Sequence, residues 1–191
     1  ESLAHLAERE GIAIGTDNRA AVAGAELVLL CVKPQMVAAV LDEIELLYHI
    51  DLNRVYLTGH SMGGHGALTC YLKNPGKYLS VSAFAPICNP SRCPWGQKAF
   101  SNYLGEDRNV WAEHDASHLI GDAQEKLPLL IDQGTADEWL TEQLMPGALE
   151  QAAIASHYPL TLRMQEGYDH GYYFVATFIE DHLRHHARAL L

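Results

Sequence analysis

Length and composition place this chain among globular proteins. It has 191 residues, of which 48% are apolar and 19% are charged, so it can bury one sizeable core and we expect a single domain. The 13 Lys and Arg residues stand against 24 Asp and Glu residues. The resulting formal net charge of −11 repels phosphate backbones and anionic membrane surfaces, which argues against nucleic acid and membranes as partners.

Signals for targeting are absent from the N-terminal sequence. It has no initiator Met and no basic segment before an apolar one, so we expect no secretory signal and a sequence that begins inside a longer chain. The longest apolar run, Ala25–Val32, is far shorter than the ~20 residues that span a bilayer. The basic run Arg184–Arg188 is predicted to be the solvated end of a helix, where cations are favoured.

The cysteines are predicted to be reduced thiols, because a chain of this size does not need disulfides to hold its core. Cys88 and Cys93 have the spacing of half a zinc site. No second Cys or His pair at ligand spacing accompanies them, so we expect no metal. The four positions are Cys31, Cys70, Cys88 and Cys93.

Short apolar runs alternate with helical patterns along the chain, which is typical of a parallel sheet covered by helices on both faces. The sequence therefore predicts an α/β fold. The segment Pro86–Glu106, rich in Pro, Asn, Cys and Trp, is predicted to be a long excursion over the sheet and a candidate binding loop. The predicted strands are 12–14, 27–32, 54–58, 80–84, 127–131 and 160–164, and the predicted helices are 35–48, 63–72, 144–156 and 173–191.

A G-x-S-x-G motif, Gly59-His60-Ser61-Met62-Gly63, lies between a predicted strand and a predicted helix, as a nucleophile elbow requires. Small residues two before and two after the serine are expected because such a turn leaves no room for side chains. The turn would hold Ser61 Oγ above the sheet, and the N–H of Met62 at the helix N-terminus would donate to an oxyanion. The alternative is an ordinary glycine-rich helix cap.

A serine nucleophile needs a base and an acid, which in this fold follow it in the order Ser, Asp, His. Asp137 and His170 each follow a predicted strand, so all three residues fall at the carboxyl edge of the sheet, where α/β proteins bind their ligands. Asp132 is too near a strand end and is predicted to cap the turn, and Asp169 is predicted to point away from the site.

From Gly59 to Leu191 the chain resembles the S-formylglutathione hydrolase (esterase D) family. The resemblance implies an α/β-hydrolase fold and a cytoplasmic serine hydrolase that cleaves S-formylglutathione and small esters, with no metal or organic cofactor. It places the nucleophile, acid and base on Ser61, Asp137 and His170, and it places His60 and Trp95 at the substrate pocket. The matching segments are GHSMGGHGAL, VSAFAPICNPSRCPWGQKAF, LLIDQGTADEWL and MQEGYDHGYYFVATFIEDHLRHHA.

The first 43 residues resemble a different family, pyrroline-5-carboxylate reductase, through TDN, AELVLLCVKPQ and the helix after it. That family binds NADP with a glycine-rich loop, but no G-x-G-x-x-G precedes the segment here, so NADP binding is not expected. We therefore expect one mosaic α/β domain, with a Rossmann-like segment over residues 1–43, a junction over 44–58 and the hydrolase part over 59–191.

This arrangement leaves the hydrolase family's early strands, and the second oxyanion donor on a loop after one of them, without an equivalent. The nearest substitute in chain order is the loop Gly15–Asn18, in which the carboxylate of Asp17 would repel an oxyanion. The two reductase-like strands that take their place would pair directly with each other or leave an open sheet edge that allows a homodimer. Two alternatives to an active hydrolase stay open, namely a catalytically impaired chimera or truncated hydrolase and an NADP-linked reductase fragment.

Overall fold

The computed structural model describes residues 3–25, 28, 39–40, 42–44 and 54–190. Contacts within the chain divide it into two compact units, residues 1–52 and 53–191. The boundary falls inside the predicted junction, and each unit is described by itself below. No helix among the described residues is long and apolar enough to cross a membrane.

The described part of the first unit consists of helices and loops. Helix α1 (Leu3–Glu10) is followed by α2 (Asn18–Val22), which begins where it does because the Asp17 carboxylate accepts hydrogen bonds from the N–H groups of Arg19 and Ala20. The side chain of Asn18 donates to Glu43 at 2.9 Å.

The predicted strand at 12–14 is wrong. These residues form an extended loop in which Ile12 and Ile14 are 52% and 54% exposed, and no described segment of this unit pairs with them. The predicted strand 27–32, and most of the predicted helix 35–48, lie outside the described residues.

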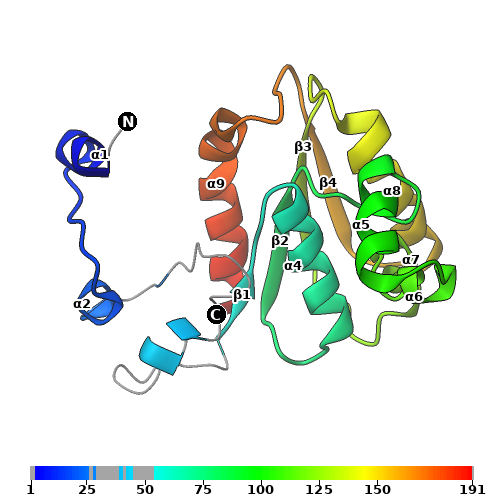
Figure 1. Cartoon of the computed structure of the whole chain (residues 1–191), viewed down its shortest axis with the longest axis horizontal. Coiled ribbons are helices and arrows are strands. Elements are labelled where there is room, and N and C mark those ends of the chain that lie inside the picture. The colour runs from blue at the N-terminus through cyan, green and yellow to red at the C-terminus, as the bar shows by residue number, and fades with distance from the viewer. Residues whose placement is uncertain (1–2, 26–27, 29–38, 41, 45–53, 191) are drawn as a thin grey trace. The chain divides into compact units, whose positions relative to one another are not determined.

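The second unit contains a parallel sheet of four strands in the order β1-β2-β3-β4 (Figure 1). Because a helix connects each strand to the next, consecutive strands lie side by side and point the same way. The register aligns Phe84 of β2 with Asp132 of β3, and Asp132 with Arg163 of β4. The strands are β1 (Tyr56–Leu57), β2 (Ser80–Phe84), β3 (Leu129–Gly134) and β4 (Leu160–Gln165).

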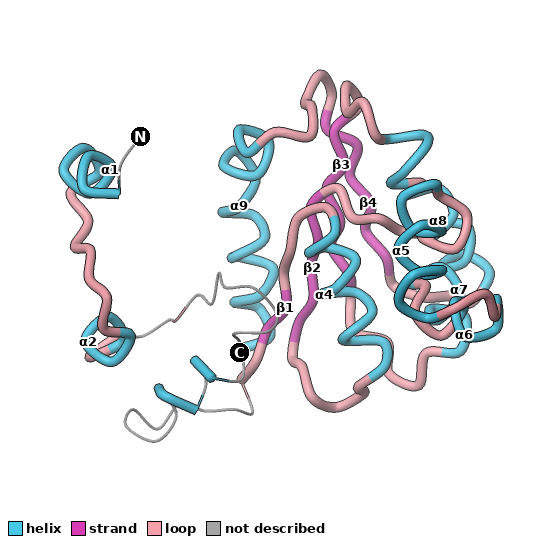
Figure 2. Tube along the Cα trace, in the orientation of Figure 1, coloured by secondary structure: helices cyan, strands magenta, loops and turns pink. Residues whose placement is uncertain are grey.

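Helices cover both faces of this sheet (Figures 1 and 2). Helices α4, α7 and α8 pack together on one face, and α9 packs against β2 and β3 on the other. The three-layer α/β architecture predicted from the sequence is confirmed for this unit. The helices are α4 (Met62–Lys73), α5 (Pro94–Leu104), α6 (Arg108–Ala112), α7 (Ala116–Leu119), α8 (Pro146–Ala155) and α9 (Tyr172–Ala187), with short turns η1 (Ile120–Asp122), η2 (Leu140–Leu144) and η3 (Arg188–Leu190).

Side chains alternate along each strand, and the two faces of the sheet differ in chemistry. The face toward α4 and α8 is apolar and carries Val81, Ala83, Leu129 and Ile131 into the main core. The opposite face, toward α9, carries Phe84 together with polar side chains. These polar residues are Ser80, Ser82, Asp132, Arg163 and Gln165. His186 of α9 bonds to Ser80 and Ser82, whereas His182 of α9, Arg163 and Gln165 all bond to Asp132.

Two further expectations need correction. Asp132 does not cap a turn: β3 continues to Gly134, so Asp132 is a fully buried strand residue. Half of the predicted excursion over residues 86–106 is helix α5, which begins after Cys93 with Pro94 in its first turn, a position that proline favours. The three described cysteines, Cys70, Cys88 and Cys93, are free thiols.

His186, near the C-terminal end of α9, is buried. His186 contacts Ser80 Oγ and Ser82 Oγ through its two ring nitrogens, each at 2.9 Å, and Ser82 Oγ in turn donates to Thr58. Burial, followed by the charges of His185 and His182, lowers the pKa of His186 to about 4. The neutral ring is therefore the form that the fold accommodates.

We predict that the free energy of unfolding falls as the pH is lowered from about 6.5 to about 4. The unfolded chain binds a proton at residue 186 in this window while the folded chain does not, and the shift corresponds to at most about 3 kcal/mol. Urea unfolding of the parent and of His186→Gln at pH 7, 6, 5 and 4 measures the effect. The variant should lose less stability across the window, and equal losses in both proteins would contradict the assignment to His186.

Candidate active site

The G-x-S-x-G motif forms a sharp turn between β1 and α4. Ser61 has φ 58° and ψ −118°, a backbone conformation that residues other than glycine rarely adopt. Its N–H donates to Phe84 O at 2.9 Å. Strained residues of this kind persist where the surrounding structure holds them, and they cluster at functional sites. The strand, strained serine and helix therefore have the arrangement of a nucleophile elbow.

Of the two motif glycines around Ser61, only Gly59 lies where a side chain has no room. A Cβ on Gly59 would lie 2.3 Å from the carbonyl oxygen of Gly63, so only glycine fits there. A Cβ on Gly63 would have open space around it, and the expectation that the turn leaves no room at this position is wrong. The second crowded position is Gly64, whose Cβ would lie 2.9 Å from the Pro86 side chain, because the loop after β2 crosses the start of α4.

The structure brings Asp137 and His170 together. His170 Nδ1 lies 2.6 Å from Asp137 Oδ2, although the two residues are 33 positions apart in the sequence. The buried Asp137 carboxylate also accepts hydrogen bonds from the N–H of Trp139 at 2.9 Å and from the side chain of Gln133 at 3.1 Å. An ionised carboxylate only accepts hydrogen bonds, so His170 carries its proton on Nδ1 and leaves Nε2 as a base.

A close approach of two loops makes this pair possible. The loop after β3 carries Asp137, and the loop after β4 carries His170. A Cβ on Gly134 would lie 2.1 Å from the carbonyl oxygen of Tyr168, and the N–H of Ala136 donates to that same oxygen at 3.0 Å. Gly134 thus lets the two strand ends meet at the carboxyl edge of the sheet.

His60 connects the elbow to this pair. Its ring packs against the ring of His170, with centroids 4.5 Å apart, and lies 5.9 Å from the ring of Tyr172. Burial, and then the charge of His170, lowers the pKa of His60, while Asp137 opposes the shift. His60 is therefore neutral near pH 7. The residue directly before Ser61 in the chain thus packs beside the histidine of the pair.

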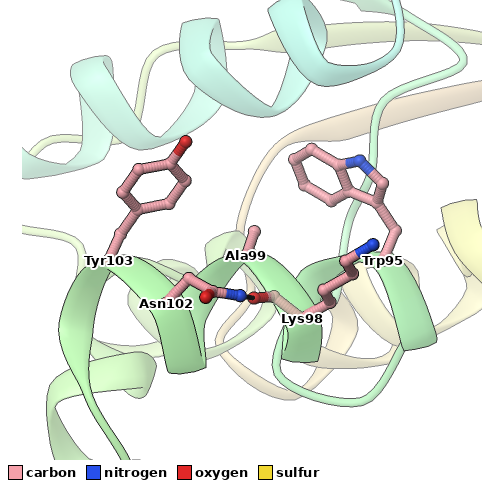
Figure 3. A pocket seen from close by; sticks show the side chains of 5 residues that line it. All are labelled: Trp95, Lys98, Ala99, Asn102 and Tyr103. Atoms are coloured by element: carbon pink, nitrogen blue, oxygen red, sulfur yellow. Dashed lines mark hydrogen bonds between the residues drawn. The ribbon is translucent and has the colours of Figure 1, made fainter.

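The two remaining sequence candidates lie on helix surfaces. Met62 is the first residue of α4, so its N–H is one of those that a helix leaves without an internal partner, and its side chain is 59% exposed. Trp95 lies at the start of α5 and donates its N–H to the Gln143 side chain. Figure 3 shows its indole at one end of a hollow of about 510 Å³, which is lined by Trp95, Lys98, Ala99, Asn102 and Tyr103. None of these belongs to the candidate triad.

Gln133 is a site residue that the sequence did not indicate. The predicted strand ends at Ile131, so Gln133 falls just past it. In the structure it is a buried strand residue that donates to Asp137. Among the described residues, no group of three or more His, Cys, Asp or Glu side chains is placed to hold a metal ion.

Comparison with known proteins identifies the class. A family model described as "Putative esterase" matches residues 38–185, and one described as "NADP oxidoreductase coenzyme F420-dependent" matches residues 1–50. The first match covers most of the chain, so the chain belongs to this esterase family. The resemblance to a hydrolase family is thereby confirmed, and the resemblance of the first residues to an NADP-linked reductase is confirmed as a similarity of residues 1–50.

Particular relatives narrow the comparison. S-formylglutathione hydrolase of Rattus norvegicus is 55% identical over 145 residues, which are 75% of this chain and 51% of the rat protein. The structure of an S-formylglutathione hydrolase from Agrobacterium tumefaciens is 44% identical with a TM-score of 0.75, covering 83% of this chain and 56% of that one. Esterase B of Lactobacillus rhamnosis, 18% identical with a TM-score of 0.63 over 80% of this chain and 58% of that one, shares the fold. The chain spans about half the length of the hydrolases that it matches.

The elbow geometry gives a matched pair of substitutions. Gly59→Ala should destabilise the second unit by several kcal/mol and prevent Ser61 from reacting, because its methyl group would overlap the backbone of Gly63. Gly63→Ala should leave stability within about 1 kcal/mol, because its methyl group enters open space. Thermal unfolding and fluorophosphonate labelling of both variants check this, and equal effects would contradict the geometry.

Proposed function

We propose that this chain is a serine hydrolase that cleaves small acyl thioesters and esters through an acyl-enzyme on Ser61, with S-formylglutathione as the substrate. The observation that carries the proposal is the hydrogen-bonded Asp137–His170 pair at the sheet edge where the strained Ser61 lies. The packing of the His60 ring, directly before Ser61 in the chain, on His170 supports the same assignment. The substrate is supported by the two hydrolase relatives.

In this mechanism His170 is the general base. Its Nε2 takes the proton of Ser61 Oγ, and the oxygen attacks the acyl carbon to give a tetrahedral intermediate. The intermediate collapses as the C–S bond breaks, and the thiolate leaves with the proton from His170. Water then repeats the sequence on the acyl-enzyme and releases the acid. Asp137 holds the imidazole in the required tautomer throughout, and no metal or organic cofactor takes part.

The N–H of Met62 is the first donor to the oxyanion, because it lies at the positive end of α4 directly after the nucleophile. A missing second donor would lower turnover by about 100- to 1,000-fold.

The remaining parts of the proposal follow from the resemblance. The substrate is a small molecule, Trp95 borders the pocket for the acyl group, and the protein acts in the cytoplasm. A homodimer through an open sheet edge is also part of it, since β1 pairs only with β2 among the described strands.

Ser61→Ala should abolish labelling by a fluorophosphonate and hydrolysis of p-nitrophenyl acetate, because the reacting oxygen is removed. Ser101→Ala, a serine of α5 outside the site, is the matched control and should react like the parent. Labelling of Ser61→Ala at another residue would refute the assignment. Labelling of the parent without turnover would show an assembled nucleophile with an incomplete oxyanion site.

Asp137→Asn should slow both reactions by about 10⁴-fold, because an amide at this place favours the wrong imidazole tautomer. Asp169→Asn is the control, since its Oδ1 only accepts a hydrogen bond from the N–H of Gly171 and an asparagine keeps that oxygen. Rates of labelling at pH 7 measure both. A larger loss of rate in Asp169→Asn than in Asp137→Asn would show that Asp137 is not the acid of the triad.

A further inference from the structure

A second Asp–His pair lies inside the molecule, between the sheet and α9. Asp132 and His182 are both fully buried, and His182 Nε2 lies 3.0 Å from Asp132 Oδ2. Arg163 and Gln165 also donate to the carboxylate, with Arg163 Nε and Gln165 Nε2 at 2.7 and 2.8 Å from Oδ1. The mechanism above uses none of these side chains.

This pair is ionised at Asp132. Burial alone would raise the pKa of the carboxyl group, but the hydrogen bonds from His182, Arg163 and Gln165 outweigh it and lower the pKa to about 2. The carboxylate therefore accepts the proton on His182 Nε2, and Nδ1 of the same ring is left buried without a hydrogen-bond partner in the described structure. Hydrogen bonding therefore holds the His182 ring at one nitrogen only. A second contact is needed to explain how the ring is oriented.

The ring of His182 is stacked on Phe84. The two centroids are 3.7 Å apart and the planes differ by 20°, while Phe174 meets Phe84 edge-on at 5.8 Å. Stacked and edge-on contacts of this kind favour one orientation of a ring over others. Phe84 is thus held between two side chains of α9.

Phe84 is also where the elbow is attached to the sheet. Its carbonyl oxygen accepts the N–H of Ser61 at 2.9 Å, and its N–H donates to Gly59 O at 2.8 Å. The carbonyl group of Phe84 forms one peptide group with the N–H of Ala85, and this N–H donates to Asp132 O at 2.8 Å. One peptide group therefore joins the backbone of the strained serine to the backbone of Asp132.

We infer that the aromatic ring of His182 makes this residue a positioning residue for the nucleophile: it holds the Phe84 ring and thereby the peptide group that keeps Ser61 in its strained conformation. The contacts form a closed circuit, from the Asp132 carboxylate through His182 to the Phe84 ring, and from the Phe84–Ala85 peptide back to Asp132. The inference rests on the proposed function for its catalytic consequence, but the circuit is a property of the fold.

The test compares three variants of the full chain. His182→Leu removes the ring and the donor, and His182→Phe keeps a ring that can stack but removes the donor. His186→Leu removes another buried histidine one turn further along α9, which bonds to Ser80 and Ser82 rather than to the circuit. His186→Leu therefore controls for the general loss of stability that follows when a buried histidine is replaced.

Amide hydrogen exchange measured by NMR reports on the circuit without requiring activity. The protection of the Ser61 and Ala85 amides, relative to that of the Leu149 amide in α8, should fall at least tenfold in His182→Leu. It should stay within about threefold of the parent in His182→Phe and in His186→Leu. Relative protection in His182→Leu equal to that in His186→Leu would overturn the inference, and so would a fall in His182→Phe as large as that in His182→Leu.

Kinetics then separate this inference from the proposed function. In a parent that reacts, His182→Leu should lower kcat for p-nitrophenyl acetate and the fluorophosphonate labelling rate at least tenfold, with KM within about twofold, while His186→Leu leaves both rates near those of the parent. A change in KM alone would overturn the positioning role. A parent that is never labelled at Ser61 would refute the proposed hydrolase, whereas the exchange measurement would still decide the circuit.

Discussion

The buried carboxylate of Asp132 is the constraint on which the second unit depends. A charge without access to water is tolerated only when it is paired and hydrogen-bonded, because desolvation otherwise costs several kcal/mol. The partners come from β4 and from α9, so the carboxylate fixes how that strand and that helix sit on β3. Parallel pairing contributes to the same end, since its register sets Phe84, Asp132 and Arg163 in one row across three strands.

The candidate active site lies next to this row, at the carboxyl ends of the strands. β2 stops at Phe84, which accepts the N–H of Ser61, and β3 continues past Asp132 to Gln133, which donates to Asp137. The elbow is therefore attached to the sheet at Phe84, the neighbour of Asp132 on β2, and the Asp137–His170 pair is attached at Gln133, the residue after Asp132 on β3. The polar face of the sheet carries Phe84 and Asp132, and the apolar face toward α4 and α8 supplies the hydrophobic stabilisation.

The mosaic character of the chain is visible in both sequence and structure. The esterase family accounts for residues 38–185, and the reductase-like match covers residues 1–50. The second unit contains its own sheet, core and acid–base pair, although the chain spans only half of its hydrolase relatives. This is physically reasonable because each βα unit of a parallel sheet packs mainly on its immediate neighbours.

The sequence by itself determined what depends on short segments and their order. Alternating apolar runs and helices predict the parallel sheet, the motif around Ser61 predicts the elbow, and strand ends predict that Asp137 and His170 lie at one edge. Only the tertiary structure decided the roles of Asp132, Gln133 and Gly64, and the packing of His60 on His170. Each of these depends on a contact with a side chain or backbone group outside its own segment. Local patterns carry no information about such neighbours, so the predicted strand ends at Ile131, whereas β3 continues through Asp132 and Gln133 to Gly134.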